Sequence, residues 1–172
     1  MGANKATLPW GDSTIIETIV DTVRRVTPGC VLLGACDELP NSLADLKQLP
    51  DAHPGIGPMA GLYSLLAGHP DRWSLLISCD VPNVTCDVIN NLVVHITPAA
   101  RIVVYTTNNR PEPCCALYHA DILPDVERAM ADRQYSLTRL IARLSPLEIE
   151  ADTPIREALG NINTPEDYRD RA

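Results

Sequence analysis

The most informative residue in the sequence is an aspartate, Asp80, because of its position. It directly follows the apolar run 73–79, which predicts a buried strand, and Val81 and Pro82 come next and cannot continue a helix. A carboxylate at the carboxyl end of a central strand is well placed to hold a divalent cation over a bound phosphate. The alternative is that Asp80 only caps a turn. The residues that accompany it favour the metal-binding interpretation.

A glycine- and proline-rich loop, HPGIGPMAG at 53–61, precedes a predicted helix. Its three glycines let the backbone approach a ligand closely, and a helix N-terminus attracts phosphate. It is not a Walker loop, because G-x-x-x-x-G-K-[ST] occurs nowhere in the sequence, and a plain turn is the alternative. Asp51, just ahead of the loop, could accept hydrogen bonds from a sugar or a base edge, or could simply be solvated.

Lys5 and Lys47 are the two lysines of the protein. Lys5 lies ahead of the first predicted helix, where its ammonium could face phosphate oxygens as a point charge. The alternative is that Lys5 is an ordinary lysine on the protein surface. A lysine, a glycine loop and a carboxylate are the parts that a site for a small phosphorylated ligand needs.

The composition of the sequence restricts the class of protein to which these residues can belong. The sequence has 172 residues, 45% of them apolar and 21% charged, which predicts one globular domain over 1–172. A net charge of −8 disfavours nucleic acid and anionic lipid as partners. Six cysteines without C-x-x-C spacing indicate buried thiols in a reduced compartment. With neither a long apolar run nor a signal peptide, the sequence predicts a cytoplasmic protein away from the membrane.

Short β-rich runs alternate with helical patterns along the sequence. Strands are predicted at 30–35, 73–78, 100–105, 114–118 and 147–150, the last at an edge, and helices at 13–26, through Leu62 to Gly68, at 87–95, 122–130 and 136–144, and from Thr164. The spacing of Thr14 and Glu17 predicts a capping box for the first helix. This alternation predicts a three-layer, doubly wound α/β fold with a mainly parallel sheet. Ligands of such sheets bind beyond the carboxyl ends of the strands.

Six segments taken in order resemble the molybdenum cofactor guanylyltransferase family. They are MGANKATLPWG, HPGIGPMAGLYSLL, LLISCDVP, RPEPCCALYHADILP, YSLTRLIARL and NINTPED, and together they span nearly the whole sequence. Each is weak alone. The series G-x-G-P-x-A-G, then C-D-x-P after an apolar strand, then N-x-N-T-P-E-D, is specific.

The resemblance implies a Rossmann-like nucleotidyltransferase fold and a reaction. The family transfers GMP from GTP to the terminal phosphate of molybdopterin, uses Mg²⁺ and releases pyrophosphate; molybdoenzyme apoproteins or their chaperones are implied protein partners. Carried over by position, it implies catalytic roles for Lys5 and Asp80, nucleotide contacts for Gly2, Lys5, Asp51 and Asp80, the magnesium ligand at Asp80, and molybdopterin or a second metal at Asn161 and Asn163.

The start of the sequence departs from the family pattern. Family members begin with a strand and a loop of the form L-x-G-G-x-S-x-R-M-G-x-D-K, and this sequence begins at its M-G, with Asn4 where an aspartate is usual. Gly34 also stands where some members have an asparagine. The missing strand would be central, so we expect unpaired main chain on its neighbours and weak or no GTP turnover by this form. Either the start is an internal methionine of a longer protein, or this is a shortened relative.

Two other functions fit the same residues. A CTP-dependent molybdopterin transferase or a sugar-phosphate nucleotidyltransferase keeps the fold and changes the substrates. A catalytically silent protein that holds molybdopterin, or assists its delivery to an apoenzyme, would explain the incomplete loop. A comparison of nucleotides separates the enzymes. Upstream coding sequence that reads L-x-G-G-x-S-x-R in frame would remove most of the support for the silent protein.

Overall fold

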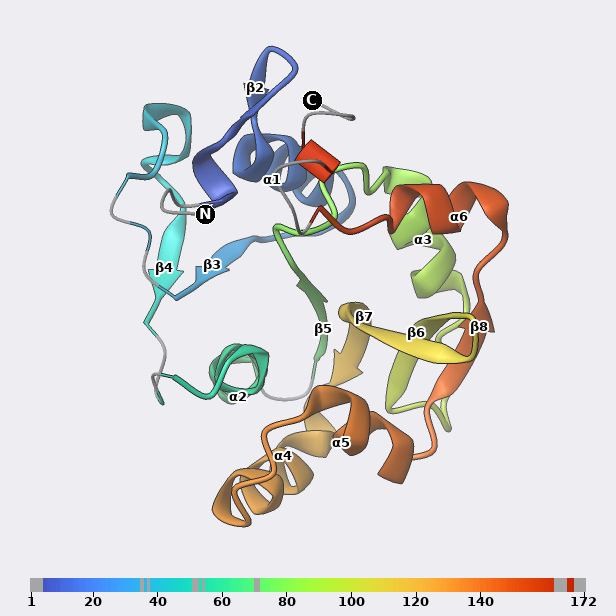
Figure 1. The fold of residues 1–172 in the computed structure, drawn as a ribbon. Coiled ribbons are helices and arrows are strands. Elements are labelled where there is room, and N and C mark those ends of the chain that lie inside the picture. The colour runs from blue at the N-terminus through green and yellow to red at the C-terminus, as the bar shows by residue number, and fades with distance from the viewer. Residues whose placement is uncertain are drawn as a thin grey trace.

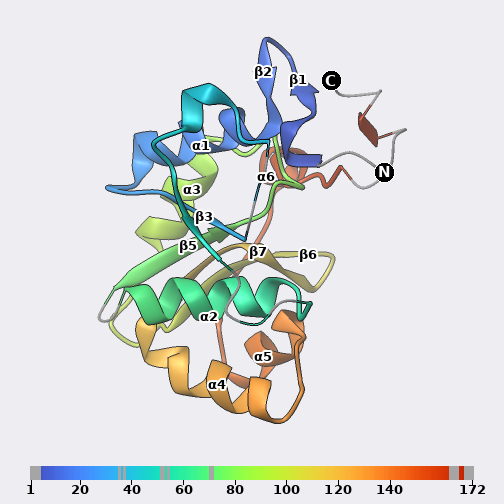
Figure 2. The same cartoon turned by 90° about the vertical axis from the view of Figure 1, so that its left-hand side faces the viewer.

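The computed structural model describes residues 5–34, 36, 38–50, 53, 55–69, 72–162 and 167–168. In this part of the protein the strands form a middle layer with helices above and below it (Figures 1 and 2). The predicted three-layer α/β architecture is therefore confirmed. None of the described helices is long and apolar enough to cross a bilayer.

The strands form one larger sheet and a separate parallel pair. The larger sheet has the order β5 (Trp73–Ile77), β7 (Arg110–His119), β6 (Ile102–Thr107) and β8 (Leu147–Glu150). β8 runs parallel to β6 at the edge of the sheet, where the sequence predicts an edge strand. β3 (Val31–Leu33) and β4 (Lys47–Leu49) pair in parallel. A short hairpin, β1 (Pro9–Trp10) with β2 (Ser13–Thr14), precedes the first helix.

β7 is the exception to the parallel pattern, because it runs antiparallel to both β5 and β6. Asn108 and Asn109 connect β6 to β7 and have φ angles of 53° and 60°. Positive φ at both central residues belongs to the two-residue hairpin turn, which can join only antiparallel strands. This turn makes the sheet mixed.

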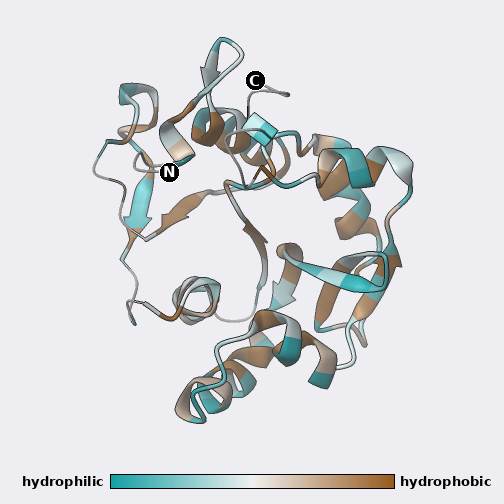
Figure 3. Ribbon diagram, in the orientation of Figure 1, coloured by the Kyte–Doolittle hydropathy of each residue, from teal (hydrophilic) through white to brown (hydrophobic). Residues whose placement is uncertain are grey.

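Helices cover the two faces of the larger sheet in two groups. α1 (Ile15–Val26), α3 (Cys86–Val94) and α6 (Thr153–Ala158) pack on one face, and α2 (Pro58–Gly68), α4 (Leu123–Ala131) and α5 (Leu137–Arg143) pack on the other. Along β6, Val103 points into the first core and Val104 into the second. Apolar residues accordingly line the inner surfaces of both helix layers (Figure 3). Three 3₁₀ turns complete the elements, η1 (Lys5–Thr7), η2 (Asn41–Leu43) and η3 (Ala120–Ile122).

Each predicted strand and each predicted helix up to residue 144 is present, with ends shifted by a few residues, β7 being the most extended. The β1/β2 hairpin, β4 and α6 are not predicted, because they are too short to show a hydrophobic period. The start of the terminal helix expected at Thr164 lies outside the described residues.

The predicted capping box at the start of α1 is present. The Thr14 hydroxyl accepts the Glu17 backbone N–H at 3.3 Å, and the Glu17 carboxylate accepts the Thr14 backbone N–H at 2.9 Å. Hydrogen bonds from Ser42 and Thr14 lower the pKa of Glu17. The box fixes the first turn of the helix that carries Ile15 and Ile19 into the core.

Thr14→Ala should lower the free energy of unfolding by about 1 kcal/mol, because it leaves the first helical N–H groups without their acceptor. A loss of this size lowers the melting temperature by roughly 2–4 °C in a domain of this size. Asp21→Ala, at an exposed position of the same helix, is the matched control and should change stability by less than about 0.5 kcal/mol. Equal losses in the two variants, measured by urea denaturation, would contradict the role given to the box.

Candidate active site

Asp80 lies in the turn that follows β5, and this turn is held from both sides. The backbone N–H of Asp80 donates to the Ser78 hydroxyl at 3.1 Å. The backbone carbonyl of Asp80 accepts the N–H of Ile162 at 2.9 Å. The side chain is 42% exposed. A fixed backbone with an accessible carboxylate suits a residue that meets a ligand.

Lys5 and Asp80 form an ion pair between Nζ and Oδ1, although they are 75 residues apart in the sequence. The Lys5 side chain is 21% exposed, so its ammonium is partly shielded from water. The structure thus brings together the two residues that the sequence predicts to be catalytic. Such a pair presents a positive and a negative group side by side, which is the polarity that phosphate and a bound cation require.

The glycine loop enters the same place through the N-terminus of α2. Gly57 is the N-cap, with φ 69° and ψ −150°, a conformation accessible essentially only to glycine, and Pro58 begins the helix. Gly57, Pro58, Lys5 and Asp80 all line one cavity of about 960 Å³. Pro58 has no N–H and the Ala60 N–H is bonded to the Gly57 carbonyl, so the start of α2 attracts an anion through the positive end of the helix dipole. This end of the cavity therefore suits a phosphate.

The remaining predicted site residues are only partly placed. Asn161 is exposed and directly precedes Ile162, whose N–H binds the Asp80 carbonyl, so its segment runs beside the Asp80 turn. Gly2, Asp51 and Asn163 lie outside the described residues. The described part of the site therefore consists of Lys5, Asp80, the start of α2 and the segment at Asn161.

Thiols surround the carboxylate and remain protonated. Cys79 and Cys114 line the cavity with Asp80. Burial, and next the charge of Asp80, raise the pKa of each of these thiols to about 11. Since the thiolate is the reactive form, neither is a nucleophile near neutral pH. All six cysteines are free, as the sequence predicts, but only Cys36 and Cys115 are buried and the other four are half-buried.

The donor set fits a cation that is shared with a ligand. In the described ranges, no group of three or more His, Cys, Asp or Glu side chains is arranged to hold a metal. Asp80 is a single accessible carboxylate at the end of a strand. Mg²⁺ is usually held by one or two carboxylates together with substrate phosphates and water. The site thus fits Mg²⁺ bound with a phosphorylated substrate, and not a structural metal.

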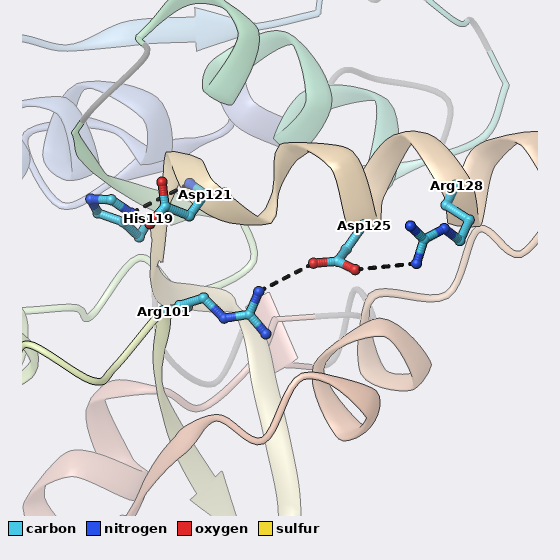
Figure 4. A network of polar contacts seen from close by, with 5 residues as sticks. All are labelled: Arg101, His119, Asp121, Asp125 and Arg128. Carbon is cyan, nitrogen blue, oxygen red and sulfur yellow. Dashed lines mark hydrogen bonds and ion pairs between the residues drawn. The ribbon is translucent and has the colours of Figure 1, made fainter.

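A second polar cluster lies at the other end of β5 and is a surface network (Figure 4). Asp125 joins Arg101 at 3.3 Å and Arg128 at 3.8 Å, and the His119 ring stands edge-on to Trp73 with 5.3 Å between ring centroids. Trp73 begins β5, so this cluster is about 20 Å of extended backbone away from Asp80. It takes no part in the candidate site.

Two groups that hold the Asp80 turn in place are not among the residues predicted from the sequence. Ser78 binds the Asp80 N–H through its hydroxyl, and Ile162 binds the Asp80 carbonyl through its N–H. The first contact could have been predicted, because Ser78 lies two residues before Asp80 at the end of a predicted strand, and a serine hydroxyl at that spacing commonly binds a backbone N–H. No local sequence pattern predicts the contact between Ile162 and Asp80, because it joins distant parts of the sequence.

Because a helix N-terminus and a lysine beside a carboxylate suit a ligand with both phosphates and a cation, the fold and the site define a nucleotide-handling α/β protein. The family model described as "MobA-like NTP transferase domain" matches residues 1–148. The chain belongs to this family and is a nucleotidyltransferase.

Curated relatives match nearly the whole protein at low identity. A protein of Flavobacterium johnsoniae is 23% identical over 170 residues, which are 99% of this chain and 88% of the relative. A protein of Carboxydothermus hydrogenoformans is 27% identical over 173 residues, 98% of this chain and 86% of the relative. Both are named "Probable molybdenum cofactor guanylyltransferase".

Solved structures confirm the fold. Molybdopterin-guanine dinucleotide biosynthesis protein A from Archaeoglobus fulgidus superposes with a TM-score of 0.78 at 20% identity, over 99% of this chain and 89% of that one. 2-C-methyl-D-erythritol 4-phosphate cytidylyltransferase from Thermus thermophilus superposes with a TM-score of 0.71 at 15% identity, over 97% of this chain and 91% of that one. At these identities the likeness shows the fold alone.

Cys79 and Cys114 should react with iodoacetamide at pH 8 roughly a hundredfold more slowly than in the urea-unfolded protein, because their raised pKa leaves little thiolate. The rate should climb about tenfold per pH unit until the pH approaches 11. Asp80→Asn should accelerate both reactions, since it removes a negative charge that raises both pKa values. Peptide mapping by mass spectrometry measures each rate, and unchanged rates in the variant would show that the carboxylate does not act on these thiols.

Proposed function

We propose that this protein transfers GMP from GTP to the terminal phosphate of molybdopterin, with release of pyrophosphate. The observation that carries the proposal is that the Lys5–Asp80 pair and the N-terminus of α2 line the same cavity. The names of the curated relatives support the choice of molybdopterin and guanine.

In this reaction a phosphate-monoester oxygen of molybdopterin attacks the α-phosphorus of GTP and pyrophosphate leaves. The protein forms no covalent bond with the substrates in this reaction. It must position two anions and stabilise the charge that develops. No side-chain nucleophile is required, in agreement with the protonated state of Cys79 and Cys114. Lys5 would bind phosphate oxygens with its ammonium, and the positive end of the α2 dipole would attract them.

Asp80 would hold Mg²⁺, which when bound neutralises phosphate charge at the reacting group. The accessible carboxylate and the backbone contacts of its turn support this role. We further assign nucleotide contacts to Gly2 and Asp51. Asn161 and Asn163 are assigned to molybdopterin or a second metal, supported for Asn161 by the contact between its neighbour Ile162 and Asp80.

The proposal extends to the setting of the enzyme. Residues 1–172 form one domain, in which the two cores share the strands of one sheet. The free thiols support a reducing cytoplasm as its location. GTP and molybdopterin are the substrates, and molybdoenzyme apoproteins or their chaperones are the proposed recipients of the product.

Thermal unfolding with GTP, CTP, ATP and GDP, each with and without Mg²⁺, tests the choice of nucleotide. A ligand at 100 times its dissociation constant adds about 2.7 kcal/mol, which is several degrees for a domain of this size. We expect the largest Mg²⁺-dependent shift with GTP. A larger shift with CTP would support the cytidylyl alternative. No shift with any nucleotide would point to the incomplete N-terminal loop, and adding that loop would then separate a truncated enzyme from the silent molybdopterin-binding alternative.

Whatever turnover of GTP with molybdopterin this form retains, Asp80→Asn and Lys5→Met should each reduce it by about 10²–10³-fold, since each removes a charge that faces developing charge. The Mg²⁺-dependent part of the thermal shift should disappear in Asp80→Asn. Asp45→Asn, which removes an exposed carboxylate paired with Arg24, is the matched control and should retain full turnover. Full turnover in both site variants, measured as pyrophosphate release, would refute the assignment.

A further inference from the structure

A second carboxylate, that of Glu112 on β7, lies at the same end of the larger sheet as Asp80. The Ser78 N–H donates to the Cys114 carbonyl at 2.9 Å, so the antiparallel register of β5 and β7 continues to this pair. Two residues further toward that end of the sheet lie Asp80 after β5 and Glu112 on β7. After burial, the charges of Asp80 and Glu112 are the causes that raise the pKa of the Cys114 thiol. Glu112 is therefore a neighbour of the candidate site.

Glu112 is half-buried and has no opposite charge beside it. Among the described residues, no lysine, arginine or histidine forms an ion pair with it. Burial raises the pKa of its carboxyl. The Thr107 hydroxyl is near enough to offset part of this rise, but it makes no hydrogen bond of normal geometry with any described residue. Since polar groups removed from water are costly without partners, Glu112 and Thr107 suit a ligand that brings hydrogen-bond donors.

These two residues lie across the sheet from Asp80. Thr107 ends β6, and β7 lies between β6 and β5. Neighbouring strands are about 4.8 Å apart, so the end of β6 is on the order of 10 Å from the end of β5. The β6–β7 turn, η1 and the start of α2 lie at the same end of the molecule (Figure 2). A ligand that extends from Asp80 over this end of the sheet therefore meets Glu112 and Thr107.

The proposed function assigns this space to the acceptor, and the inference rests on that function. Lys5 and Pro58 line the cavity together with β3 but with no described residue of β6. The phosphates of the nucleotide would therefore lie on the β3 side of Asp80. In phosphoryl transfer the attacking and leaving oxygens stand roughly in line, on opposite sides of the phosphorus. With pyrophosphate held by Lys5, the acceptor would approach from the other side of Asp80, where β7 and β6 lie.

We infer that Glu112 binds the ring of the acceptor and selects it, by accepting hydrogen bonds from a ring N–H and the amino group next to it. A pterin carries these two donors side by side on its amino-pyrimidinone edge, and a carboxylate accepts such a pair with its two oxygens. Guanine has the same edge, so the nucleotide is the other source of this chemistry. The position of Glu112 and Thr107 on the β6 side of Asp80 favours the pterin.

Binding of pterin and of lumazine, followed by their fluorescence, tests the inference without turnover. Lumazine has a carbonyl in place of the amino group, so an acceptor would face the Glu112 carboxylate, which only accepts. The wild-type protein should bind pterin about tenfold more tightly than lumazine. Glu112→Gln should reverse this preference, because its amide can donate to the lumazine carbonyl and accept from the ring N–H. A merely structural effect would weaken both ligands and would not reverse their order.

Glu127→Gln, which changes an exposed carboxylate on α4, is the matched control and should keep the wild-type preference. The same comparison with GTP and xanthosine triphosphate separates the two sources of the ring. If Glu112→Gln reverses the preference between these nucleotides and not that between pterin and lumazine, Glu112 binds the nucleotide base and the assignment to the acceptor is wrong. Equal affinity of the wild-type protein for pterin and lumazine, or no binding of either at millimolar concentration, would also overturn the inference.

The result can be told apart from failure of the proposed reaction, because ring binding is measured without pyrophosphate release. Pyrophosphate release from GTP and molybdopterin together with equal affinity for the two rings would refute the role of Glu112 alone. Selection of pterin through Glu112 without any pyrophosphate release would keep that role and count against the reaction.

Discussion

The division of the described strands into a larger sheet and the separate β3/β4 pair is the constraint on which the rest of the structure depends, because within the described residues no strand of the larger sheet pairs with β3 or β4. α2 packs against both β3 and β5, so it joins the β3/β4 pair to the larger sheet. Gly61 shows how closely α2 holds that pair, since a Cβ there would lie 3.2 Å from Leu33.

The same arrangement positions the candidate site. Asp80 follows the end of β5, Gly57 starts the helix that lies on β3, and Lys5 lines the end of the cavity near Asp80. The Lys5–Asp80 pair thus links the N-terminal turn to the larger sheet.

Local patterns in the sequence were enough to predict the elements but not their partners. The helical period of α1, the capping box at Thr14 and the buried run before Asp80 are each contained in a few adjacent residues, and each is confirmed. The Lys5–Asp80 contact joins residues 75 positions apart, so no window along the sequence could show it. The antiparallel direction of β7 depends on two positive φ angles at Asn108 and Asn109, a signal present in the sequence but weaker than the strand–helix alternation around it. β4 is short and starts with exposed polar residues, which leaves no hydrophobic period to detect.

Charge explains how an acidic protein can handle polyphosphates. A net charge of −8 repels a long polyanion, which would need many cations spread over a surface. A nucleotide needs only a few groups directed at its phosphates, and the described site supplies one ammonium and one helix N-terminus. Lys5 and Asp80 compensate each other, so neither charge is left unpaired in its partly buried position. In the proposed reaction the substrate brings phosphates for the lysine and a cation for the aspartate. Each residue then exchanges one partner for another of the same sign, and the site accepts a highly charged ligand without acquiring an uncompensated charge of its own.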